Sequence, residues 1–558
     1  MAIRIADVAA DIGLSHHDFI SWGGGGGFTE EERVRFQDPN ALVDESEVPR
    51  LTTDRFGVEI NWMGIPGTRC VTRWGALHFK SLNDQGTFPL RNITLIVGPN
   101  SSGKSSVLES ILWIGHACVT EDLDVRKPRA AFKEVDLGGF ENTIYRHSRK
   151  RGLTFSFDLH PRILEDGIDY HSPLRIALTV CHAAPSRGER RLKGKDARGK
   201  SSSKSPGLVE IRIEADNRTI LRARKQSEGN VLKVVSCDPS HPMFGTLFKT
   251  IWEADPDDKF ATKKLTILRK LMALCLRHQG LAVRGIDTRM AFKSRQVSEH
   301  LASLLSRYHS KERRALSEWA RGIIGRFCIE CEGLLESVSQ ALRKYTDSGC
   351  YLGAALGAER DACFDTLFKD DEILAETNTF LERLNIPFRL SCRRSRKGKN
   401  GIRITDLRNG TTVLPSAVGS SFNQVVSLLV ALLKEHKNRA ERTFLMEEAF
   451  RQLHPAAQAE MGDVLIQCAL GDYQHRFVVE THSEHLILRL LRRIRQTHEK
   501  DPSYPDKLPK ITPHDVSIVY AQPTKNGTKL RHLEISPEGR FLDDWPDGFF
   551  TERMRELL

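Results

Sequence analysis

The sequence predicts an α/β fold in which two lobes of alternating strands and helices are separated by a helical insertion. Short apolar segments bounded by turn residues begin near residue 71, and a helical pattern follows from Gly103. Between about residues 243 and 385 the apolar residues recur at three- and four-residue spacing, as in helices. Strands resume near residue 401, and the alternation continues to about residue 495. A chain of 558 residues, 40% of them hydrophobic, can bury such a core.

The composition argues against a membrane-spanning or disulfide-stabilised protein. The sequence has no apolar run long enough to cross a bilayer, and its first segment is interrupted by Arg4, Asp7 and Asp11, so we expect neither a membrane span nor a secretory signal. The 11 cysteines are odd in number and scattered, which fits a reducing compartment. We therefore expect a cytoplasmic protein.

Composition and pattern divide the chain into five parts. The first contains five consecutive glycines, Gly23 to Gly27, which lose much backbone entropy in any regular structure, so we expect a flexible or partner-ordered extension there. The predicted parts are an N-terminal extension (1–60), a first lobe (61–240), a helical insertion (241–385), a second lobe (386–500) and a C-terminal module (501–558).

The chain is basic overall, which favours a polyanionic partner. It has 83 Lys and Arg against 72 Asp and Glu, a net charge of +11, so we expect binding to nucleic acid, either DNA or RNA. The loop 187–204 concentrates eight basic and two acidic residues among Gly and Ser, without apolar periodicity. It is either a solvated linker or a contact for a phosphate backbone, and composition leaves both open.

The stretch GPNSSGKSS matches the phosphate-binding pattern G-x-x-x-x-G-K-[ST]. It directly follows the apolar strand pattern ITLIV and directly precedes the helical pattern SVLESILWI, which is the context that the motif requires. Backbone N–H groups and the helix start can bind phosphate oxygens, Lys104 can reach the β and γ oxygens, and Ser105 can ligate Mg²⁺. We therefore expect ATP and Mg²⁺ as ligands. The expected nucleotide contacts are Gly98, Pro99, Asn100, Ser101, Ser102, Gly103, Lys104, Ser105 and Ser106.

Two adjacent carboxylates, Glu447 and Glu448, end the apolar run TFLM. Taken alone, paired acids at a strand end are usually solvated. With a phosphate loop in the same chain they fit the acidic element that ATP hydrolysis requires. We assign Glu447 to the Mg²⁺ ligands and Glu448 to the catalytic role of polarising the attacking water.

Two further segments place polar residues where a strand ends or a helix begins. The strand pattern RFVVE is followed by Thr481 and His482, and a hydrogen-bonding side chain there suits a sensor of the γ-phosphate, so we assign His482 to the catalytic residues. Gly419, Ser420 and Ser421 precede a strongly apolar helix. They form either an ordinary helix N-cap or a phosphate contact across a dimer interface, and their spacing does not decide.

In combination, these motifs resemble those of a known family. The order of phosphate loop, long insertion, Ser/Gly helix start, Glu-Glu strand, LHP and ETHSEH looks like that of the ABC-type ATPases related to SMC, RecF and the overcoming-lysogenization-defect (OLD) proteins. The closing stretch from PHDVSIVYAQ to WPDGFF is similar to the C-terminal module of the ATPase subunits of Septu-type and retron-associated antiphage systems. The resemblance covers about residues 71–180 and 400–558, and it implies an ABC-type P-loop ATPase head split by a helical insertion.

The resemblance also implies roles for single residues. It makes Glu447 the acidic residue on the Mg²⁺ side, Glu448 the catalytic carboxylate and His482 the switch histidine, and it places Leu453, His454 and Pro455 on a dimer-contacting loop. The signature-like residues that would contact the nucleotide of a second copy are Gly419, Ser420, Ser421 and Gln424.

The chain departs from the family pattern at two places. Ala449 and Phe450 stand where the family commonly has Pro and Glu, and the signature-like segment lacks the usual Gly-x-Gly before Ser-Gln. We therefore expect slow or partner-dependent hydrolysis. A glutamine-bearing loop after the P-loop helix is not recognisable in VDLGGFENTIY, where Glu141 is the candidate.

The half-site that the family implies must be completed by a second copy, so a head-to-head dimer follows, with ATP holding two copies together and hydrolysis releasing them. The leading hypothesis is a defence ATPase that senses or grips nucleic acid and controls a separate effector nuclease of the His-Asn-His (HNH) type. The segment after His482 is too short for the nuclease domain of OLD-type relatives, so we expect this chain to cut nothing itself. The alternatives are a DNA-repair or chromosome-clamp ATPase of the RecF/SMC type and an ATP-binding switch with little hydrolysis.

Overall fold

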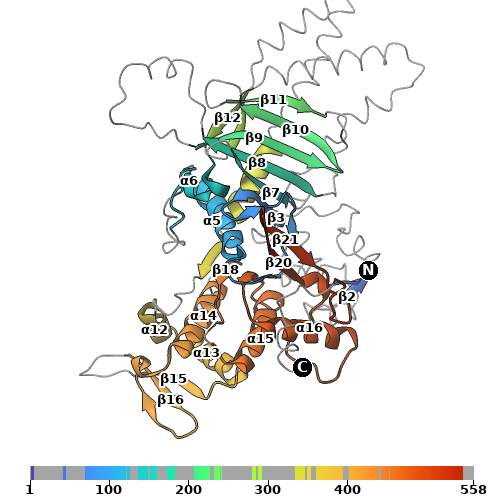
Figure 1. Cartoon of the computed structure of the whole chain (residues 1–558). Coiled ribbons are helices and arrows are strands. Elements are labelled where there is room, and N and C mark those ends of the chain that lie inside the picture. The colour runs from blue at the N-terminus through green and yellow to red at the C-terminus, as the bar shows by residue number, and fades with distance from the viewer. Residues whose placement is uncertain are drawn as a thin grey trace, which may run out of the picture.

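The computed structural model has the predicted α/β class and is organised around one large mixed sheet (Figure 1). The predictions for the basic loop 187–204, and for the extension 1–60 apart from strands β1 (Ala2–Arg4) and β2 (Leu42–Asp44), lie outside the described residues. The structure describes residues 2–4, 42–44, 70–120, 122–125, 136–148, 151–159, 173–182, 206–225, 231–238, 241, 280–284, 287–291, 334–345, 348–352, 360–393, 401–437, 441–451 and 453–543.

Five neighbouring strands of the 16-stranded sheet are parallel and form its centre. In spatial order they are β20 (Val516–Thr524), β6 (Ile93–Val97), β19 (Arg476–Glu480), β18 (Thr443–Glu447) and β14 (Gly349–Leu352). Strand β19 therefore lies between β6, which leads into the phosphate loop, and β18, which ends in Glu447. Parallel strands end at the same edge of a sheet, so this order brings motifs from distant parts of the chain together.

The rest of the sheet is largely antiparallel and forms the upper part of the molecule in Figure 1, continuing past β8 to β11. Strands β21 (Gly527–Leu533) and β4 (Leu82–Asn83) connect it to the parallel centre, and β5 (Phe88–Pro89) pairs with β3. Its strands are β3 (Val71–Phe79), β7 (Leu153–Leu159), β8 (Leu174–His182), β9 (Pro206–Ala215), β10 (Arg218–Lys225), β11 (Val231–Cys237), β12 (Gly280–Arg284) and β13 (Asp287–Ala291).

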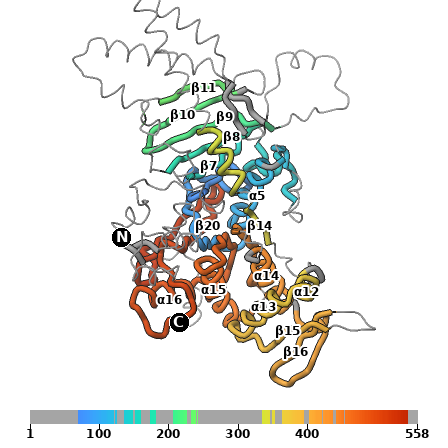
Figure 2. Tube along the Cα trace, turned by 180° about the vertical axis from the view of Figure 1, so that it is seen from behind, coloured from blue at the N-terminus to red at the C-terminus, as the bar shows by residue number. Residues whose placement is uncertain are grey.

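Helices lie on both faces of the parallel centre, and the lower part of the molecule is mainly helical (Figure 2). The helices are α5 (Lys104–Thr120), α6 (Phe140–Thr143), residues 334–345, α12 (Arg360–Lys369), α13 (Asp371–Arg383), α14 (Ser420–Lys437), α15 (Pro455–Leu470) and α16 (Glu484–His498). Three 3₁₀ turns are η3 (Tyr145–His147), η8 (Pro415–Ala417) and η9 (Pro513–Asp515). A small sheet comprises β15 (Phe388–Arg393), β16 (Gly401–Asp406) and β17 (Thr412–Val413). Within the described part of the chain, no helix is both long and apolar enough to cross a membrane.

Alternate residues of the parallel strands face two separate cores. Ile96, Leu445 and Val478 belong to the core that contains α5 and residues 334–345, whereas Leu95 and Phe444 belong to the core that contains α14, α15 and α16. Successive side chains of a strand point to opposite faces, and here both faces are covered. The strands therefore have continuous apolar sequences.

A buried arginine ties the parallel centre to the antiparallel part. Arg476, at the start of β19, donates hydrogen bonds to the carbonyl oxygens of Arg91 at 3.1 Å and Val71 at 2.6 Å, and also to that of Leu90. Burying a guanidinium is unfavourable unless its N–H groups have partners. Carbonyl groups from the segments beside β3 and β6 supply these partners, so Arg476 holds the two parts of the sheet in one arrangement.

The structure corrects one element of the predicted organisation. In the range 241–385, expected to be helical, residues 280–284 and 287–291 form the hairpin β12–β13, and residues 349–352 form β14. These strands have only four or five residues, and β14 is stabilised by pairing with β18, far along the chain. The C-terminal segment also contributes to the parallel centre of the sheet, because its strand β20 pairs with β6. The exact domain limits remain a prediction.

We predict that His532 makes stability fall below neutral pH. Burial and the nearby Arg91 and Arg73 lower the pKa of His532 from its usual 6.5 to about 4, so the unfolded chain takes up the proton more readily than the folded one. Stability should be unaffected above pH 6.5 and decline as the pH falls toward 4. Because His532 is only partly buried, we expect a loss of roughly 1–2 kcal/mol.

The measurement is the free energy of unfolding, or the melting temperature, of the wild type and His532→Gln between pH 4 and 7.5. The variant should gain relative stability as the pH falls. Exposed His498, replaced by Gln in the same way, is the matched control and should follow the wild type. Parallel pH profiles for the wild type and His532→Gln would contradict the prediction.

Candidate functional site

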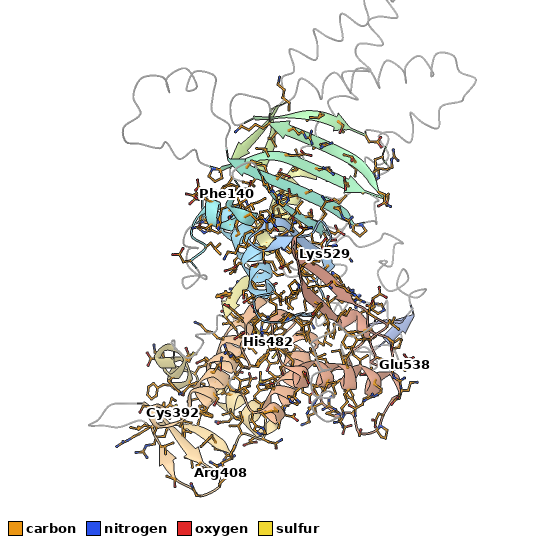
Figure 3. The ribbon with its side chains drawn as sticks, viewed as in Figure 1. Phe140, Cys392, Arg408, His482, Lys529 and Glu538 are labelled. Carbon is orange, nitrogen blue, oxygen red and sulfur yellow. The ribbon has the colours of Figure 1, made fainter. Side chains whose placement is uncertain are left out.

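The predicted phosphate loop, the Glu-Glu pair and His482 meet at the carboxyl edge of the parallel strands. In the register of the sheet, Glu447 at the end of β18 lies opposite Glu480 at the end of β19, and Glu480 lies opposite Ile96 in β6. Figure 3 shows His482 in the middle of the molecule, between the sheet-rich upper part and the helix-rich lower part. Three segments from different regions of the chain therefore border one site.

The loop after β6 has the backbone shape that the motif requires. Gly98 and Gly103 adopt positive φ angles of 145° and 95°, and Ser101 is left-handed with φ 58°. A Cβ atom at Gly98 would lie 2.7 Å from the carbonyl oxygen of Ala521 and 2.9 Å from Ser102 Oγ. Successive amides in such a loop point inward and form a nest for an anion, at the start of α5.

A polar clamp holds the outer side of this loop. Thr528 Oγ1, from β21, donates a hydrogen bond to the carbonyl oxygen of Ser102 at 2.6 Å and lies 3.1 Å from Ser81 Oγ. These contacts come from segments at opposite ends of the chain. They fix the loop before any ligand binds.

Lys104 and Ser105 are the first two residues of α5 and point toward the neighbouring strand ends. Lys104 is 4% exposed, and its Nζ donates to the carbonyl oxygen of Pro99 at 2.9 Å. Burial lowers the pKa of Lys104, whereas the carboxylates of Glu480 and Glu448 oppose this shift. Ser105 Oγ donates to Glu480 Oε1 at 3.1 Å. The amine is thus a buried cation between the loop and the acids.

Glu448 lies in a conformation unusual for its residue type, with φ 45°. Its N–H donates to the carbonyl oxygen of Glu480 at 3.1 Å, which fixes the turn after β18. Its carboxylate accepts a hydrogen bond from Arg451 at 2.9 Å, and Oε1 lies 3.6 Å from His482 Nε2. Strained backbone of this kind is concentrated at functional sites. The two residues assigned to catalysis are therefore neighbours.

The environment of His482 favours its neutral form. Burial and the positive charge of Lys104 lower the pKa of His482, and the nearby Glu448 acts in the opposite direction. A neutral imidazole can both donate and accept a hydrogen bond. The adjacent Thr481 Oγ1 accepts from the N–H of Ser483, which caps α16, so the turn that carries His482 is rigid.

Glu447 has a partner that the sequence did not suggest. The hydroxyl of Tyr351, from β14, donates a hydrogen bond to Glu447 Oε2, and burial together with this contact raises the pKa of Tyr351. Nearby, Glu109 of α5 forms an ion pair with Lys80 at 2.6 Å. Tyr351 therefore holds the Glu447 carboxylate on the β14 side of the site.

Glu480 is the main residue that the sequence interpretation missed. It is 4% exposed, Oε1 accepts the Ser105 hydrogen bond, and Oε2 has no hydrogen-bond partner among the described residues. Burial raises the pKa of the Glu480 carboxyl to about 7, against the opposing effects of Ser105 and Lys104. An acid that ends the apolar strand pattern RFVVE was the available signal, since Glu447 ends its strand in the same way.

The signature-like segment lies at the start of α14, away from these contacts. Gly419 and the preceding Leu414 are exposed, Leu414 by 64%, while Asn423 Oδ1 and Gln424 Oε1 are buried. Among the described residues, no hydrogen bond joins this segment to the phosphate loop of the same chain. Its predicted role toward a nucleotide, with Ser420 and Ser421, remains a prediction.

The residues present fit a nucleotide phosphate and Mg²⁺. The glycine positions leave no room for side chains, Ser102 Oγ is buried with no hydrogen-bond partner among the described residues, and Lys104 lies near the acids. Ser105, Glu480 and Glu447 provide hard oxygen donors near the loop. Mg²⁺ is typically held by one or two carboxylates together with substrate phosphates, so a donor set of this kind suits it.

Comparisons with known proteins give little beyond this geometry. A family model described as a protein of unknown function (DUF3696) matches residues 511–558, which is less than half of the chain and does not assign it to a family. The comparison with curated proteins gives no match.

Among solved structures, the chain is similar to three SMC head domains. The SmcHead bound to the C-winged helix domain of ScpA is 12% identical, with a TM-score of 0.35 over 84% of this chain and 98% of that chain. The Smc head with an extended coiled coil bound to the C-terminal domain of ScpA, from Pyrococcus furiosus, is 12% identical, with a TM-score of 0.34 over 87% and 98%. The SMC head domain from Thermotoga maritima is 10% identical, with a TM-score of 0.33 over 83% and 99%. At these TM-scores we base no functional conclusion on the likeness.

We predict that Gly103→Ala disrupts the phosphate loop. The added Cβ would lie 2.3 Å from Ser81 Oγ and 2.6 Å from Thr528 Oγ1, at a φ of 95° that side chains rarely adopt. Relieving the overlap would break the Thr528 clamp, and backbone strain alone is worth about 1–3 kcal/mol. Gly401→Ala is the matched control, because no atom lies within 4 Å of its added Cβ. A melting temperature for Gly103→Ala equal to that of Gly401→Ala would contradict this account.

Proposed function

We propose that this chain is an ABC-type ATPase that binds ATP with Mg²⁺ and hydrolyses it. The observation that carries the proposal is the convergence of Lys104, Ser105, Glu448 and His482 at one edge of the parallel strands. Phosphoryl transfer requires positioning and electrostatic stabilisation more than covalent chemistry, and these groups supply both. Hydrolysis is slow or depends on a partner in this proposal, because Ala449 and Phe450 stand where the family commonly has Pro and Glu.

Each residue has a distinct task in this proposal. The loop amides and Lys104 bind the β and γ phosphate oxygens, and Ser105, with the neighbouring acids, holds the cation, which neutralises charge on the phosphates when it is bound. Glu448 orients the attacking water and accepts its proton, while Arg451 and the backbone contact to Glu480 fix the carboxylate in place. His482, 3.6 Å from Glu448, donates or accepts a hydrogen bond beside the γ-phosphate.

A second copy would complete the site, in a head-to-head dimer. The support is that the segment before α14 is exposed, with Leu414 64% exposed, and that His454 and Pro455 after β18 are also exposed. Both segments are therefore accessible to a second copy of the chain. Gly419, Ser420, Ser421 and Gln424 would then cover the nucleotide bound to the partner.

We predict that Lys104→Ala and Glu448→Gln affect different steps. Lys104→Ala should weaken ATP binding, because it removes the buried cation of the loop. Glu448→Gln should bind ATP as the wild type does but hydrolyse it at least 100-fold more slowly, on the order expected for a lost general base. The ATP-bound dimer should persist longer in that variant.

The measurements are the ATP affinity, the rate of phosphate release and the lifetime of the dimer. Exposed Lys529 and Glu499, replaced by Ala and Gln respectively, serve as matched controls and should behave like the wild type. If Glu448→Gln fails to bind ATP, or hydrolyses it at the wild-type rate, its proposed role is wrong.

The finer proposal is a defence ATPase of the Septu or retron type, which senses or grips nucleic acid and controls an effector nuclease of HNH type. Its support is the resemblance of the C-terminal stretch and the net charge of +11. Among the described arginines of the antiparallel sheet, Arg175 pairs with Asp158, and Arg222 and Arg224 share the single carboxylate of Glu210, so their positive charge is partly compensated within the chain. The alternatives are a RecF/SMC-type repair or clamp ATPase and a binding-only switch.

We predict that the purified chain does not cleave nucleic acid without a partner. A nuclease site needs several convergent carboxylates or histidines around one or two cations, and the carboxylates that meet beside the phosphate loop, Glu447, Glu448 and Glu480, are assigned to the ATP site in this proposal. The assay combines the chain with ATP, Mg²⁺ or Mn²⁺, and plasmid, single-stranded DNA or transfer RNA. Cleavage that survives rigorous purification and is lost on mutating a carboxylate of this chain would overturn the prediction.

A further inference from the structure

We propose that Glu480 is the principal carboxylate of the cation site, acting with Ser105, and that Glu447 supplies the second carboxylate. This inference rests on the proposed ATPase function and deepens it. The sequence motifs assign the cation to Ser105 and Glu447 alone. In the structure, the acid that is hydrogen-bonded to Ser105 is instead Glu480, at the end of β19, the strand that pairs with β6.

The first argument is contact. Ser105 Oγ donates to Glu480 Oε1 at 3.1 Å, so Glu480 orients the hydroxyl and leaves its lone pairs directed away from the carboxylate. Strand β19 is hydrogen-bonded directly to β6, whereas β18 is one strand farther away. Neighbouring strands are about 4.8 Å apart, so Glu447 starts farther from Ser105 than Glu480 does.

The second argument is an unused oxygen. Glu480 is 4% exposed, and its Oε2 has no hydrogen-bond partner among the described residues. A buried carboxylate oxygen without a partner is unfavourable, and such an oxygen beside a phosphate site is a ready ligand for a cation or its bound water. The nearby cation, Lys104, directs its amine to the carbonyl oxygen of Pro99 at 2.9 Å.

The third argument is the position of Glu447. Its Oε2 accepts the Tyr351 hydroxyl, from the strand on the side opposite the phosphate loop. The Cα atoms of Glu447 and Glu480 are partners in the parallel register, so their negative charges repel one another unless a cation lies between them. Within the part of the chain that the structure describes, no group of three or more His, Cys, Asp and Glu side chains is arranged to hold a metal ion. The cation therefore depends on the nucleotide for its remaining ligands, as is usual for Mg²⁺.

The test measures metal affinity rather than activity. Mn²⁺ is titrated by electron paramagnetic resonance into the wild type, Glu480→Gln and Glu447→Gln, with and without a non-hydrolysable ATP analogue. The affinity for the analogue is also measured in EDTA. Glu484→Gln, in the first turn of α16, is the matched control.

We expect Glu480→Gln to weaken Mn²⁺ binding by roughly 10–100-fold, and Glu447→Gln to weaken it less. In EDTA, Glu480→Gln should bind the analogue as well as or better than the wild type, because a negative charge near the phosphates is removed. If Glu480 is a cation ligand, its replacement should weaken Mn²⁺ affinity without weakening the affinity for the analogue in EDTA. If Glu480 is needed only for packing, its replacement should weaken both affinities.

Three outcomes would overturn the inference: wild-type Mn²⁺ affinity in Glu480→Gln, a larger loss in Glu447→Gln, or equal losses with and without metal. If Glu480→Gln does not fold, Glu480→Asp decides in its place, since the shortened acid no longer reaches Ser105 and should weaken Mn²⁺ at least several-fold; an unchanged affinity overturns the inference. Failure of the wild type to bind the analogue in any condition would contradict the ATPase proposal and this inference with it, whereas analogue binding by the wild type together with unchanged Mn²⁺ affinity in Glu480→Gln would overturn this inference alone.

Discussion

The hydrogen-bonded ladder that joins β6, β19 and β18 is the constraint on which the site depends. It places residue 480 opposite both residue 96 and residue 447, although residue 96 lies more than 350 positions before either of them in the chain. A shift of one residue in this register would turn Glu480 from the site toward a hydrophobic core. The register is strongly specified, because alternate residues of each strand fill two different cores, and Arg476 ties the start of β19 to the segments beside β3 and β6.

The same geometry answers why two charged residues follow one another at the end of β18. Glu447 is still in the strand and meets Tyr351, whereas Glu448 has left it in a left-handed turn and meets Arg451 and His482. The change of backbone conformation between them sends adjacent carboxylates to different partners. Their mutual repulsion is thereby reduced, and the two roles proposed for these residues fall to carboxylates with different partners.

Short sequence patterns correctly predicted the elements that depend only on neighbouring residues. The phosphate loop lies between a strand and a helix as its motif predicts, and the apolar runs before Glu447 and Thr481 are strands because both of their faces are buried. The pairing of strands that are far apart in the chain could not be predicted from the sequence. Strand β14 is four residues long and stabilised by β18, and β12 and β13 lie in a range whose apolar spacing suggested helix. Tyr351 and Thr528 belong to the site only through such pairings, so no motif pointed to them, whereas Glu480 had a local signal as the acid that ends an apolar strand.

The carboxylates of Glu480 and Glu448 also influence the charge of the buried Lys104. Burial alone would favour a neutral amine, and it is the carboxylates of Glu480 and Glu448 that oppose this and keep a cation at the start of α5. A charged amine is needed to attract phosphates, yet the same carboxylates repel them. In the proposed ATPase, a divalent cation bound with the nucleotide would reconcile these demands, because it would neutralise the acids while Lys104 stayed charged beside the loop. In the proposed ATPase, nucleotide and metal would therefore bind together, and the buried Glu480–Ser105 contact lies where the two would meet.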